Sequence, residues 1–285
     1  MEKLVLVEEG IFPITVNHLG EVVEEAPKTG WLFPGTLQGE GKLAGVPSLF
    51  IRLAACNLRC IWQLPNGSFS RCDTAYASFE VGKTKTLNSD EIIQTLKNNK
   101  GNISHLVISG GEPLLQRAGL IELCQKVKTQ LNMHITIETN GTLFDAELAK
   151  YIDLASISPK LKNSEPSDEK MSHYKLQSAG VFRYHSEIRK NISVIQSWID
   201  FAKINDNDYQ LKFVVASIEE ANEIQNEYLD LLSNYSPTDV LLMPLGANSI
   251  ELHETSHLVL QLAVKKGWRY CSRVHIELFG SKSGV

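Results

Sequence analysis

Three cysteines in one short segment are the residues best suited to chemistry. Cys56 and Cys60 form a C-x3-C pair, and Cys72 follows after eleven further residues. Three thiolates can bind three irons of a [4Fe–4S] cluster and leave the fourth iron open, whereas iron–sulfur clusters usually have four cysteine ligands. The segment therefore predicts a cluster that binds a cofactor. The residues between Cys60 and Cys72 include Pro-Asn-Gly at 65–67 and predict a loop.

A zinc site is the main alternative at these cysteines. Structural zinc takes four ligands, usually with C-x2–4-C pairs, and neither a histidine nor a fourth cysteine lies nearby in the sequence. A non-catalytic iron–sulfur or zinc-binding protein therefore stays as an alternative. The two remaining cysteines, Cys124 and Cys271, stand alone in apolar surroundings and are expected to be buried structural thiols.

A second signal is the sequence SGGEP at residues 109–113. It directly follows a short apolar run, HLVIS, that is typical of a buried strand. Glycines such as Gly110 and Gly111 let the backbone approach a ligand closely, and the carboxyl end of a strand is where barrel enzymes place their active sites. A site at this end of the strand is therefore expected.

An alternation of β-branched runs and helical patterns must position these motifs. The expected strands are 48–53, 105–109, 134–138, 154–158, 210–215 and 240–243, and the expected helices begin near 88–89 and cover 114–129, 145–151, 218–232 and 253–266. Such alternation predicts an α/β fold with right-handed crossovers. About six units are present against the eight of a full barrel, so we expect a partial (β/α)6-type TIM barrel with insertions.

The chain is expected to form a single domain over residues 1–285. Residues 1–30 precede the first motif and read as an N-terminal extension that adds a strand or an arm. Residues 161–207 are polar and irregular apart from a helical pattern near 188–204, and read as an insertion without visible chemistry.

The net charge and the length of the apolar runs exclude some classes of binding partner. The net charge of −5 offers no basic surface for a phosphate backbone, so nucleic acid is not expected as a partner. No apolar run approaches the ~20 residues of a membrane span, and the first residues carry glutamates where a signal peptide would be apolar. We therefore expect a cytoplasmic protein with reduced thiols.

Several motifs together resemble a known family. C-x3-C with a third cysteine, followed by GGEP, resembles the radical S-adenosylmethionine (SAM) superfamily. Within it, the chain is similar to the 7-carboxy-7-deazaguanine synthase family in TLQGEG at 36–41, Arg52, CDT at 72–74, ETNG at 138–141, SPK at 158–160 and the ending GSKSGV. The likeness covers about residues 31–160 and the C-terminus, and the region between matches only in its strand–helix rhythm.

The resemblance implies a reaction and its cofactors. A member of this family converts 6-carboxy-5,6,7,8-tetrahydropterin to 7-carboxy-7-deazaguanine and ammonia, in the biosynthesis of queuosine and related 7-deazapurines. It uses a [4Fe–4S] cluster, SAM and Mg²⁺. A homodimer and a one-electron reductant such as flavodoxin or ferredoxin are also implied. Another small radical SAM enzyme, such as an activating enzyme for a glycyl-radical protein, is an alternative that would not explain the TLQGEG and CDT motifs together.

The resemblance also implies residue roles, none of them as a catalytic acid or base. Cys56, Cys60 and Cys72 would bind the cluster. The SAM amino group would be bound by the backbone at Gly110 and Gly111, the SAM ribose by Glu138, and other parts of SAM by Ser158 and Lys160. The pterin would be contacted by Gln38 and Glu40, its carboxylate by Arg52 and the Mg²⁺ by Thr74, and the substrate would be covered by His275 and the carboxylate of Val285. The competing interpretations are an ion pair at Arg52, a helix N-cap by Asp73 or Thr74, a solvated Lys160 and a structural His275.

The chain departs from the family pattern at two places. Relatives have C-x3-C-x2-C, whereas here residues 63–71 are inserted before Cys72. A longer loop costs little entropy, so a cluster can still form. The second departure is Met243-Pro244, where relatives tend to carry Gln-Pro. A methionine cannot supply the hydrogen bonds of the glutamine amide, so Met243 is not assigned to the site.

Overall fold

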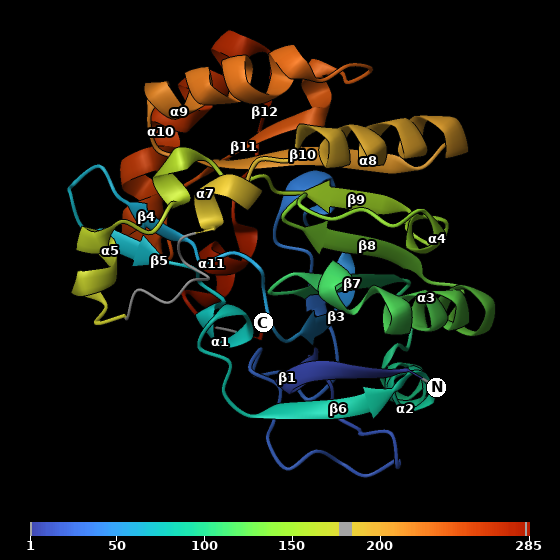
Figure 1. The fold of residues 1–285 in the computed structure, drawn as a ribbon. Coiled ribbons are helices and arrows are strands. Elements are labelled where there is room, and N and C mark those ends of the chain that lie inside the picture. Colours follow the sequence, from blue (N-terminus) through green and yellow to red (C-terminus); the bar gives the residue numbers. More distant parts are fainter. Residues whose placement is uncertain (1, 177–183, 283) are drawn as a thin grey trace.

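A curved sheet with helices outside it forms the body of the protein. The computed structural model describes residues 2–176, 184–282 and 284–285. Six parallel strands lie side by side in chain order: β3 (Pro47–Leu53), β7 (His105–Gly110), β8 (His134–Thr139), β9 (Leu154–Ile157), β10 (Asp208–Val215) and β11 (Val240–Pro244) (Figure 1). All six predicted strands are present, which confirms the partial (β/α)6 barrel.

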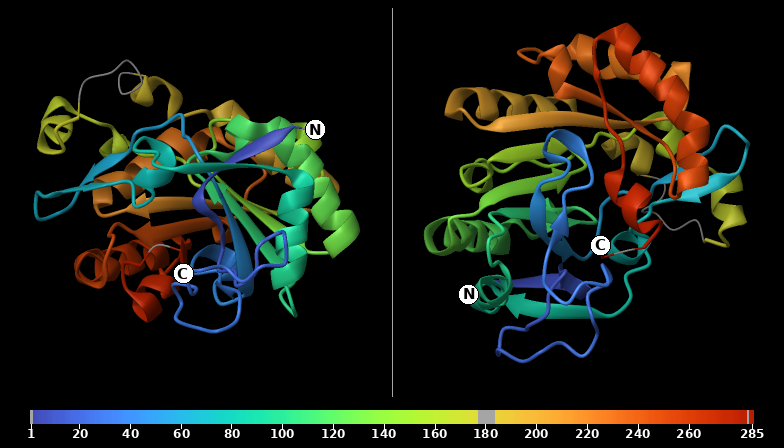
Figure 2. Two further views of the ribbon diagram at one scale, coloured as in Figure 1. Left: turned by 90° about the horizontal axis from the view of Figure 1, so that it is seen from below. Right: turned by 180° about the vertical axis from the view of Figure 1, so that it is seen from behind.

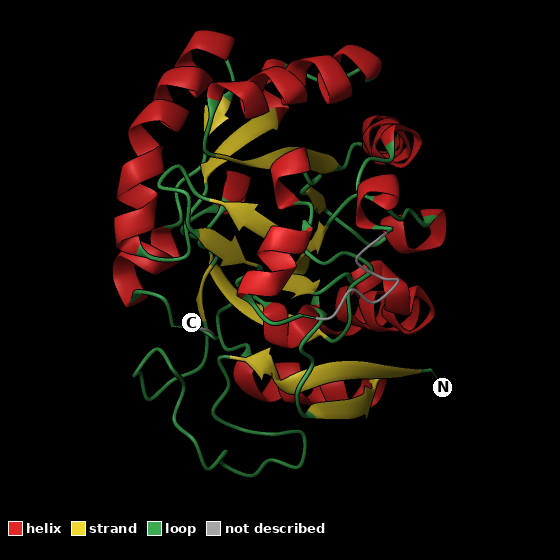
Figure 3. Ribbon diagram, turned by 60° about the vertical axis from the view of Figure 1, so that its left-hand side comes forward, coloured by secondary structure: helices red, strands yellow, loops and turns green. Residues whose placement is uncertain are grey.

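The helices cover the outer face of these strands, as Figure 3 shows. They are α2 (Ser89–Asn99), α3 (Arg117–Lys126), α4 (Ala146–Ala149), α8 (Ile192–Asn205), α9 (Ile218–Glu223) and α10 (Ser249–Lys266). The α2 helix begins where its sequence predicts, because the Asn88 side chain accepts from the N–H of Glu91 at 3.0 Å and Glu91 accepts in return from the N–H of Asn88 at 2.8 Å. Among the described residues, none of the helices combines the length and apolarity that a membrane crossing requires.

Two expected helices are more broken than their sequences indicate. The segment 114–129 starts with a 3-10 turn, Pro113–Gln116, continues as α3 and ends in a π turn, Val127–Leu131. The segment 218–232 is likewise α9 followed by a π turn, Ile224–Tyr228. Helical periodicity does not distinguish these tight and wide turns from α-helix.

Additional strands extend the sheet at both edges. The N-terminal strand β1 (Lys3–Phe12) pairs antiparallel with β3, and β6 (Thr84–Asn88) pairs antiparallel with β1. Beyond β11 lies the short strand β12 (Arg269–Tyr270). The strand β2 (Thr36–Leu37) pairs with the start of β3, and the chain that follows it reaches the start of β10, where the Lys42 ammonium meets Asp208 at 2.6 Å.

The segment between Cys60 and Cys72 is a β-hairpin rather than a loop. Strands β4 (Ile61–Gln63) and β5 (Phe69–Arg71) pair antiparallel, and only residues 64–68 form the turn, in which Gly67 has φ +85°. The composition of 65–67 marks this turn correctly but does not reveal the strands on either side. In Figure 1 the hairpin lies beside α5 (Asp168–His173), and the Tyr174 hydroxyl donates to the carbonyl of Phe69 at 2.7 Å.

Candidate functional site

A pocket of about 300 Å³ opens at the carboxyl ends of the barrel strands. The two views in Figure 2 show that the C-terminus lies beside the segments that enclose this end. Every residue that the sequence assigns to the site lines the pocket: Gln38, Glu40, Arg52, Cys56, Cys60, Cys72, Thr74, Gly110, Gly111, Glu138, Ser158, Lys160, His275 and Val285. The structure therefore brings together residues that are up to 247 positions apart (285 − 38) in the sequence.

The hairpin brings the third cysteine next to the second. Ile61 pairs with Arg71 at the base of the hairpin, and one residue further the backbone N–H of Cys72 donates to the carbonyl of Cys60 at 3.1 Å. The insertion thus leaves Cys60 and Cys72 as neighbours across an antiparallel ladder. Its length does not move the third thiol away from the other two.

The three thiols lie in an apolar shell. Leu58, Trp62, Leu64, Ala216 and Leu245 pack around Cys60, with Cys56 and Cys72 against this group. Burial is the largest cause that raises the pKa of the Cys56 thiol, to about 11, and it raises the pKa of Cys60 and of Cys72 as well.

These thiols must lose their protons to bind iron, so the site stabilises thiolates only together with a positively charged group. Among the described residues, no three His, Cys, Asp or Glu side chains converge as the ligands of one ion would. The cysteines of a cubane bind separate irons and therefore stand farther apart. The donor set and its apolar neighbours fit an iron–sulfur cluster.

The two glycines of GGEP are needed for backbone packing. A Cβ at Gly110 would approach the backbone of Leu53, and a Cβ at Gly111 would overlap the carbonyl of Ala55, directly before the first cysteine. The N–H of Gly111 donates to Leu53 at 3.2 Å, and that of Glu112 to Ala55 at 2.9 Å. This close contact fixes the β7 end against the segment that carries Cys56.

Glu112 is a structural residue that the sequence analysis did not identify. Its fully buried carboxylate accepts from the backbone N–H groups of Leu114 and Asn140, at 3.0 and 2.8 Å, and from the Thr139 hydroxyl. It thus ties the end of β7 to the ETNG turn. The Asn140 amide in turn donates to the Asn57 side chain at 2.8 Å, so the same network reaches the cysteine segment.

The predicted SAM-contact residues lie on neighbouring strand ends. Glu138 accepts from the Ser109 hydroxyl at 2.8 Å and from the Gln38 amide at 3.2 Å. The Lys160 ammonium donates to the hydroxyl and the carbonyl of Ser158, both at 2.8 Å. The ammonium of Lys160 is therefore held at the strand end, while the residue itself is half-buried.

Arg52 carries an unused hydrogen-bonding group. Its guanidinium lies 5.5 Å from the centre of the Phe12 ring, and Nη1 donates weakly to the Ser109 hydroxyl at 3.4 Å. The Nε group is buried and has no hydrogen-bond partner. Within the described part of the chain no carboxylate lies in ion-pair distance of Arg52, so the alternative of a structural ion pair is wrong, and the guanidinium is free to bind an acid from the pocket.

Glu40 sits in a network of buried charges that the sequence analysis did not foresee. Its two oxygens meet the ammonium of Lys212 at 2.5 Å and Nε of Arg273 at 2.9 Å. The other end of the Arg273 guanidinium meets Asp73 at 2.5 Å, directly after the third cysteine. Burial by itself raises the pKa of the Glu40 carboxyl, but Lys212, Arg273 and His275 outweigh it and hold that pKa far below its usual range.

The C-terminal segment packs on the TLQGEG turn. The N–H of Val274, the first residue of α11 (Val274–Phe279), donates to the carbonyl of Gly39 at 3.0 Å. A Cβ at Gly39 would overlap the imidazole of His275. The N–H of Gly41 donates to the thiol sulfur of Cys271 at 3.0 Å, so this cysteine is the buried structural thiol that its sequence surroundings predict, as is the fully buried Cys124.

Thr74 occupies the N-cap position of α1 (Ala75–Ser78), but its side chain does not cap the helix. Its hydroxyl lies 3.3 Å from the Cys72 sulfur and lines the pocket. Thr74 therefore occupies the N-cap position with its backbone, but its hydroxyl does not bond to the N–H groups at the start of α1.

Comparisons with known proteins agree with this geometry. The Radical SAM superfamily model matches residues 51–163. The 7-carboxy-7-deazaguanine synthase of Halobacterium salinarum is 36% identical over 249 residues, which cover 86% of this chain and 87% of the relative. The namesake from Rhodopirellula baltica is 34% identical over 248 residues, 87% of this chain and 85% of the relative.

The fold has a counterpart among solved structures. The crystal structure of QueE from Escherichia coli matches with a TM-score of 0.53 and 21% identity, over 93% of this chain and 95% of that one. Because two relatives above 30% identity align over most of both chains, the chain belongs to the 7-carboxy-7-deazaguanine synthase family of the radical SAM superfamily.

Proposed function

We propose that this enzyme converts 6-carboxy-5,6,7,8-tetrahydropterin to 7-carboxy-7-deazaguanine and ammonia, as a step of 7-deazapurine biosynthesis that leads to queuosine or a related base. The observation that carries this assignment is the half-buried Arg52 side chain, whose Nε is buried and unpartnered, in the same pocket as the three cysteines. An unpaired cation at that place suits a substrate that brings a carboxylate.

Cys56, Cys60 and Cys72 would hold the [4Fe–4S] cluster in this proposal. SAM would lie across the strand ends, with its amino group at the backbone of Gly110 and Gly111, and with Glu138, Ser158 and Lys160 as further contacts. Support comes from the pocket, which these residues line together. When bound, the cluster and SAM supply the radical chemistry of hydrogen abstraction, while the protein binds, orients and shields the reactants.

The substrate would lie between Arg52 and the TLQGEG turn. An ionised Glu40 accepts hydrogen bonds from the donor edge of a pterin, and Lys212 and Arg273 keep it ionised. Gln38 already donates to Glu138 and accepts from the N–H of Glu40 at 3.2 Å, so it joins the SAM side of the pocket to the substrate side. His275 and the Val285 carboxylate would close the pocket from the C-terminal side.

Mg²⁺ and two protein partners complete the proposal. Thr74 lines the pocket, and its hydroxyl makes no cap hydrogen bond to α1, so this hydroxyl would be the protein ligand of Mg²⁺, a cation that prefers oxygen and keeps several waters. A homodimer and a small one-electron donor protein such as flavodoxin or ferredoxin are expected for the family.

Anaerobic reconstitution with iron and sulfide tests the function. The reconstituted protein is then incubated with SAM, Mg²⁺, a reductant and the carboxylated pterin, and 7-carboxy-7-deazaguanine is the expected product. A protein that cleaves SAM but leaves this pterin unchanged would rule out the substrate and favour another small radical SAM enzyme. A protein that forms a cluster but does not cleave SAM would instead be a non-catalytic iron–sulfur protein.

A further inference from the structure

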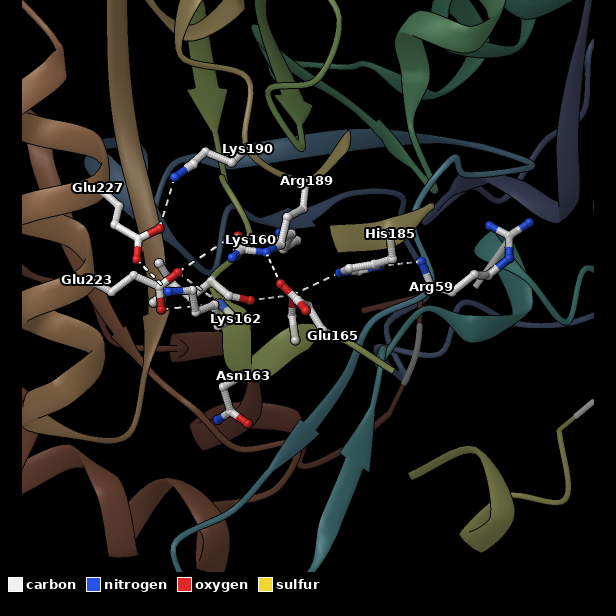
Figure 4. A network of polar contacts seen from close by, with 12 residues as sticks. Arg59, Lys160, Lys162, Asn163, Glu165, His185, Arg189, Lys190, Glu223 and Glu227 are labelled. Carbon is white, nitrogen blue, oxygen red and sulfur yellow. Dashed lines mark hydrogen bonds and ion pairs between the residues drawn. The ribbon is translucent and has the colours of Figure 1, made fainter. Parts of the chain in front are cut away.

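The segment 161–207, expected to be an insertion without chemistry, contains a histidine that reaches the cysteine segment. His185, the first residue of α7 (His185–Ile188), is 0% exposed. Its Nδ1 lies 3.1 Å from the backbone N–H of Arg59, between the first two cysteines. Its Nε2 lies 3.1 Å from the Ser164 hydroxyl. Figure 4 shows the imidazole directed at Arg59 from the side of this segment.

The hydrogen bonds of Ser164 determine the tautomer of the His185 imidazole. The Ser164 hydroxyl has one proton, and it donates that proton to the carbonyl of Leu161 at 2.7 Å. Ser164 must therefore accept from His185, so Nε2 carries the proton and the lone pair of Nδ1 accepts the N–H of Arg59. Only a neutral imidazole in this tautomer satisfies both neighbours.

Other contacts of the segment hold His185 in place. Arg189, one residue after α7, donates to the carbonyl of Lys160 at 2.9 Å and pairs with Glu165 at 2.5 Å (Figure 4). On the other side, Asn163 accepts from the N–H of Gln63 at 2.9 Å and donates to its carbonyl at 3.0 Å. The segment is thus fixed both to the end of β9 and to the hairpin that places Cys72.

Without His185, the Arg59 N–H would lose the acceptor that the structure gives it, in a part-buried place next to a fully buried imidazole. The Arg59 side chain itself donates to the carbonyls of Cys56 and Leu58, so it does not accept this N–H. Since an N–H that loses its acceptor away from water is costly, an acceptor at the position of Nδ1 favours one backbone conformation between the two cysteines.

We propose that His185 is a positioning residue for the cluster: as an acceptor for the Arg59 N–H, it presets the backbone that carries Cys56 and Cys60 before iron arrives. This inference builds on the cluster ligands proposed above. It also gives a function to the described parts of this segment, residues 161–176 and 184–189, which would pack against the outer side of the cysteine segment. The same residues support the hairpin on the far side of Cys60.

Hydrogen exchange in the metal-free protein tests this role without any activity assay. In His185→Leu the Arg59 amide is expected to exchange about tenfold faster than in the unmutated protein. His185→Asn, whose side-chain oxygen can take the place of Nδ1, is expected to keep the protection. His185→Gln carries its oxygen farther out, near the position of Nε2, and is expected to lose it. Equal protection of Arg59 in all variants would overturn the proposal.

A second buried histidine provides a matched control. His105 is 2% exposed and also bonds through both ring nitrogens, to the hydroxyls of Ser48 and Thr136 at 2.7 and 2.8 Å, but it lies at the opposite end of β7. His105→Leu is expected to lower the melting temperature without faster exchange at Arg59. If it speeds that exchange as much as His185→Leu does, His185 acts only through global stability. Should His185→Leu not fold, the contrast between the Asn and Gln variants decides.

Iron content and the electron paramagnetic resonance signal of the reduced cluster form an independent readout. His185→Leu is expected to reconstitute less cluster and to change the signal, with His185→Asn close to the unmutated protein. If the unmutated protein binds no cluster, the cluster ligands are wrong, but the exchange experiment on His185 still stands. Normal cluster content and signal in both His185→Leu and His185→Gln would overturn the positioning role.

Discussion

The backbone N–H of Cys72 donates to the carbonyl of Cys60 at 3.1 Å, directly next to the first cross-strand pair of a β-hairpin, Ile61 and Arg71. A loop of this length would leave the third thiol at a variable distance from the other two. A ladder sets that distance by register, because each residue of β5 faces a fixed residue of β4. The insertion therefore keeps the three thiols on one pocket wall.

Register, and not the length of the insertion, should determine whether the cluster forms. Replacing the turn residues 65–67 by Asn-Gly keeps Leu64 opposite Ser68 and Gln63 opposite Phe69, with a turn suited to a two-residue hairpin. We expect this variant to bind nearly as much iron and sulfide after reconstitution as the unmutated protein.

Deleting Ser70 alone also shortens the hairpin by one residue but shifts the strand by one position, which turns side chains to the opposite face. We expect this variant to lose most of its cluster. Iron analysis of both proteins checks the prediction, and a fully loaded deletion variant would contradict it.

Cys72→Ala should abolish the visible absorbance of the reconstituted cluster, because a cubane held by two thiolates lacks its third iron ligand. The matched control is Cys124→Ala, which removes a thiol buried in the main core. This control should lower stability by leaving a small cavity yet retain full absorbance. Cluster content in Cys72→Ala equal to that of the unmutated protein would show that another residue is the third ligand.

The sequence was most informative about the barrel and the pocket wall. The six parallel strands could be predicted because a strand buried on both faces is a continuous apolar run, as in HLVIS and HITIE. That the proposed site residues line one pocket could be predicted because motifs at successive strand ends meet at one edge of the sheet. The TLQGEG turn and the C-terminal tail were assigned to the site only from the resemblance to the family, because the hydrophobic pattern of the sequence does not indicate that they lie at that edge.

Contacts between distant segments were not predictable. Arg273 meets Glu40 across 233 positions, and nothing near either residue indicates the other. Lys212 offered a weak signal, since a lysine in the apolar strand QLKFVV must have a buried partner. The hairpin was missed because β4 and β5 have only three residues each, too few for a periodic pattern, while the Pro-Asn-Gly turn dominates the composition.

Arg52→Lys should raise the KM for the carboxylated pterin by about tenfold to a hundredfold, because lysine keeps the charge but loses the two parallel donors that match a carboxylate. The KM for SAM should change little. Steady-state kinetics of the reconstituted enzyme measures both. Arg117→Lys, at an exposed pair with Asp145, serves as the control. An unchanged pterin KM in Arg52→Lys would remove Arg52 from the substrate site.

Gly39→Ala should destabilise the packing of α11 on the TLQGEG turn, since the new methyl group overlaps the His275 imidazole. Overpacking of this kind costs about 1–3 kcal/mol, measured as the free energy of unfolding. Gly82→Ala, where an added Cβ meets nothing, is the control. Adding His275→Ala to Gly39→Ala should restore part of the lost stability, and failure to do so would mean that the clash is relieved elsewhere.

Lys212→Met should destabilise the protein by about 3–5 kcal/mol, because it leaves Glu40 with one cationic partner fewer in a buried place. The double variant Lys212→Met with Glu40→Gln should recover part of this loss, since a neutral amide needs no counter-charge. Denaturant unfolding of the two single variants and the double variant gives the coupling energy between these side chains. Additive effects would mean that the 2.5 Å contact contributes nothing to folding.

Acidification provides a second measure of the same pair. The folded-state pKa of Glu40 lies below its unfolded value, so the ionised carboxylate contributes its full stability above the unfolded pKa of about 4.3. That contribution falls as the pH drops below this value. Glu40→Gln has no such proton to bind, so its stability should decline less steeply with acid than that of the unmutated protein. Parallel acid-unfolding curves below pH 4 would contradict an ionised Glu40 in the folded state.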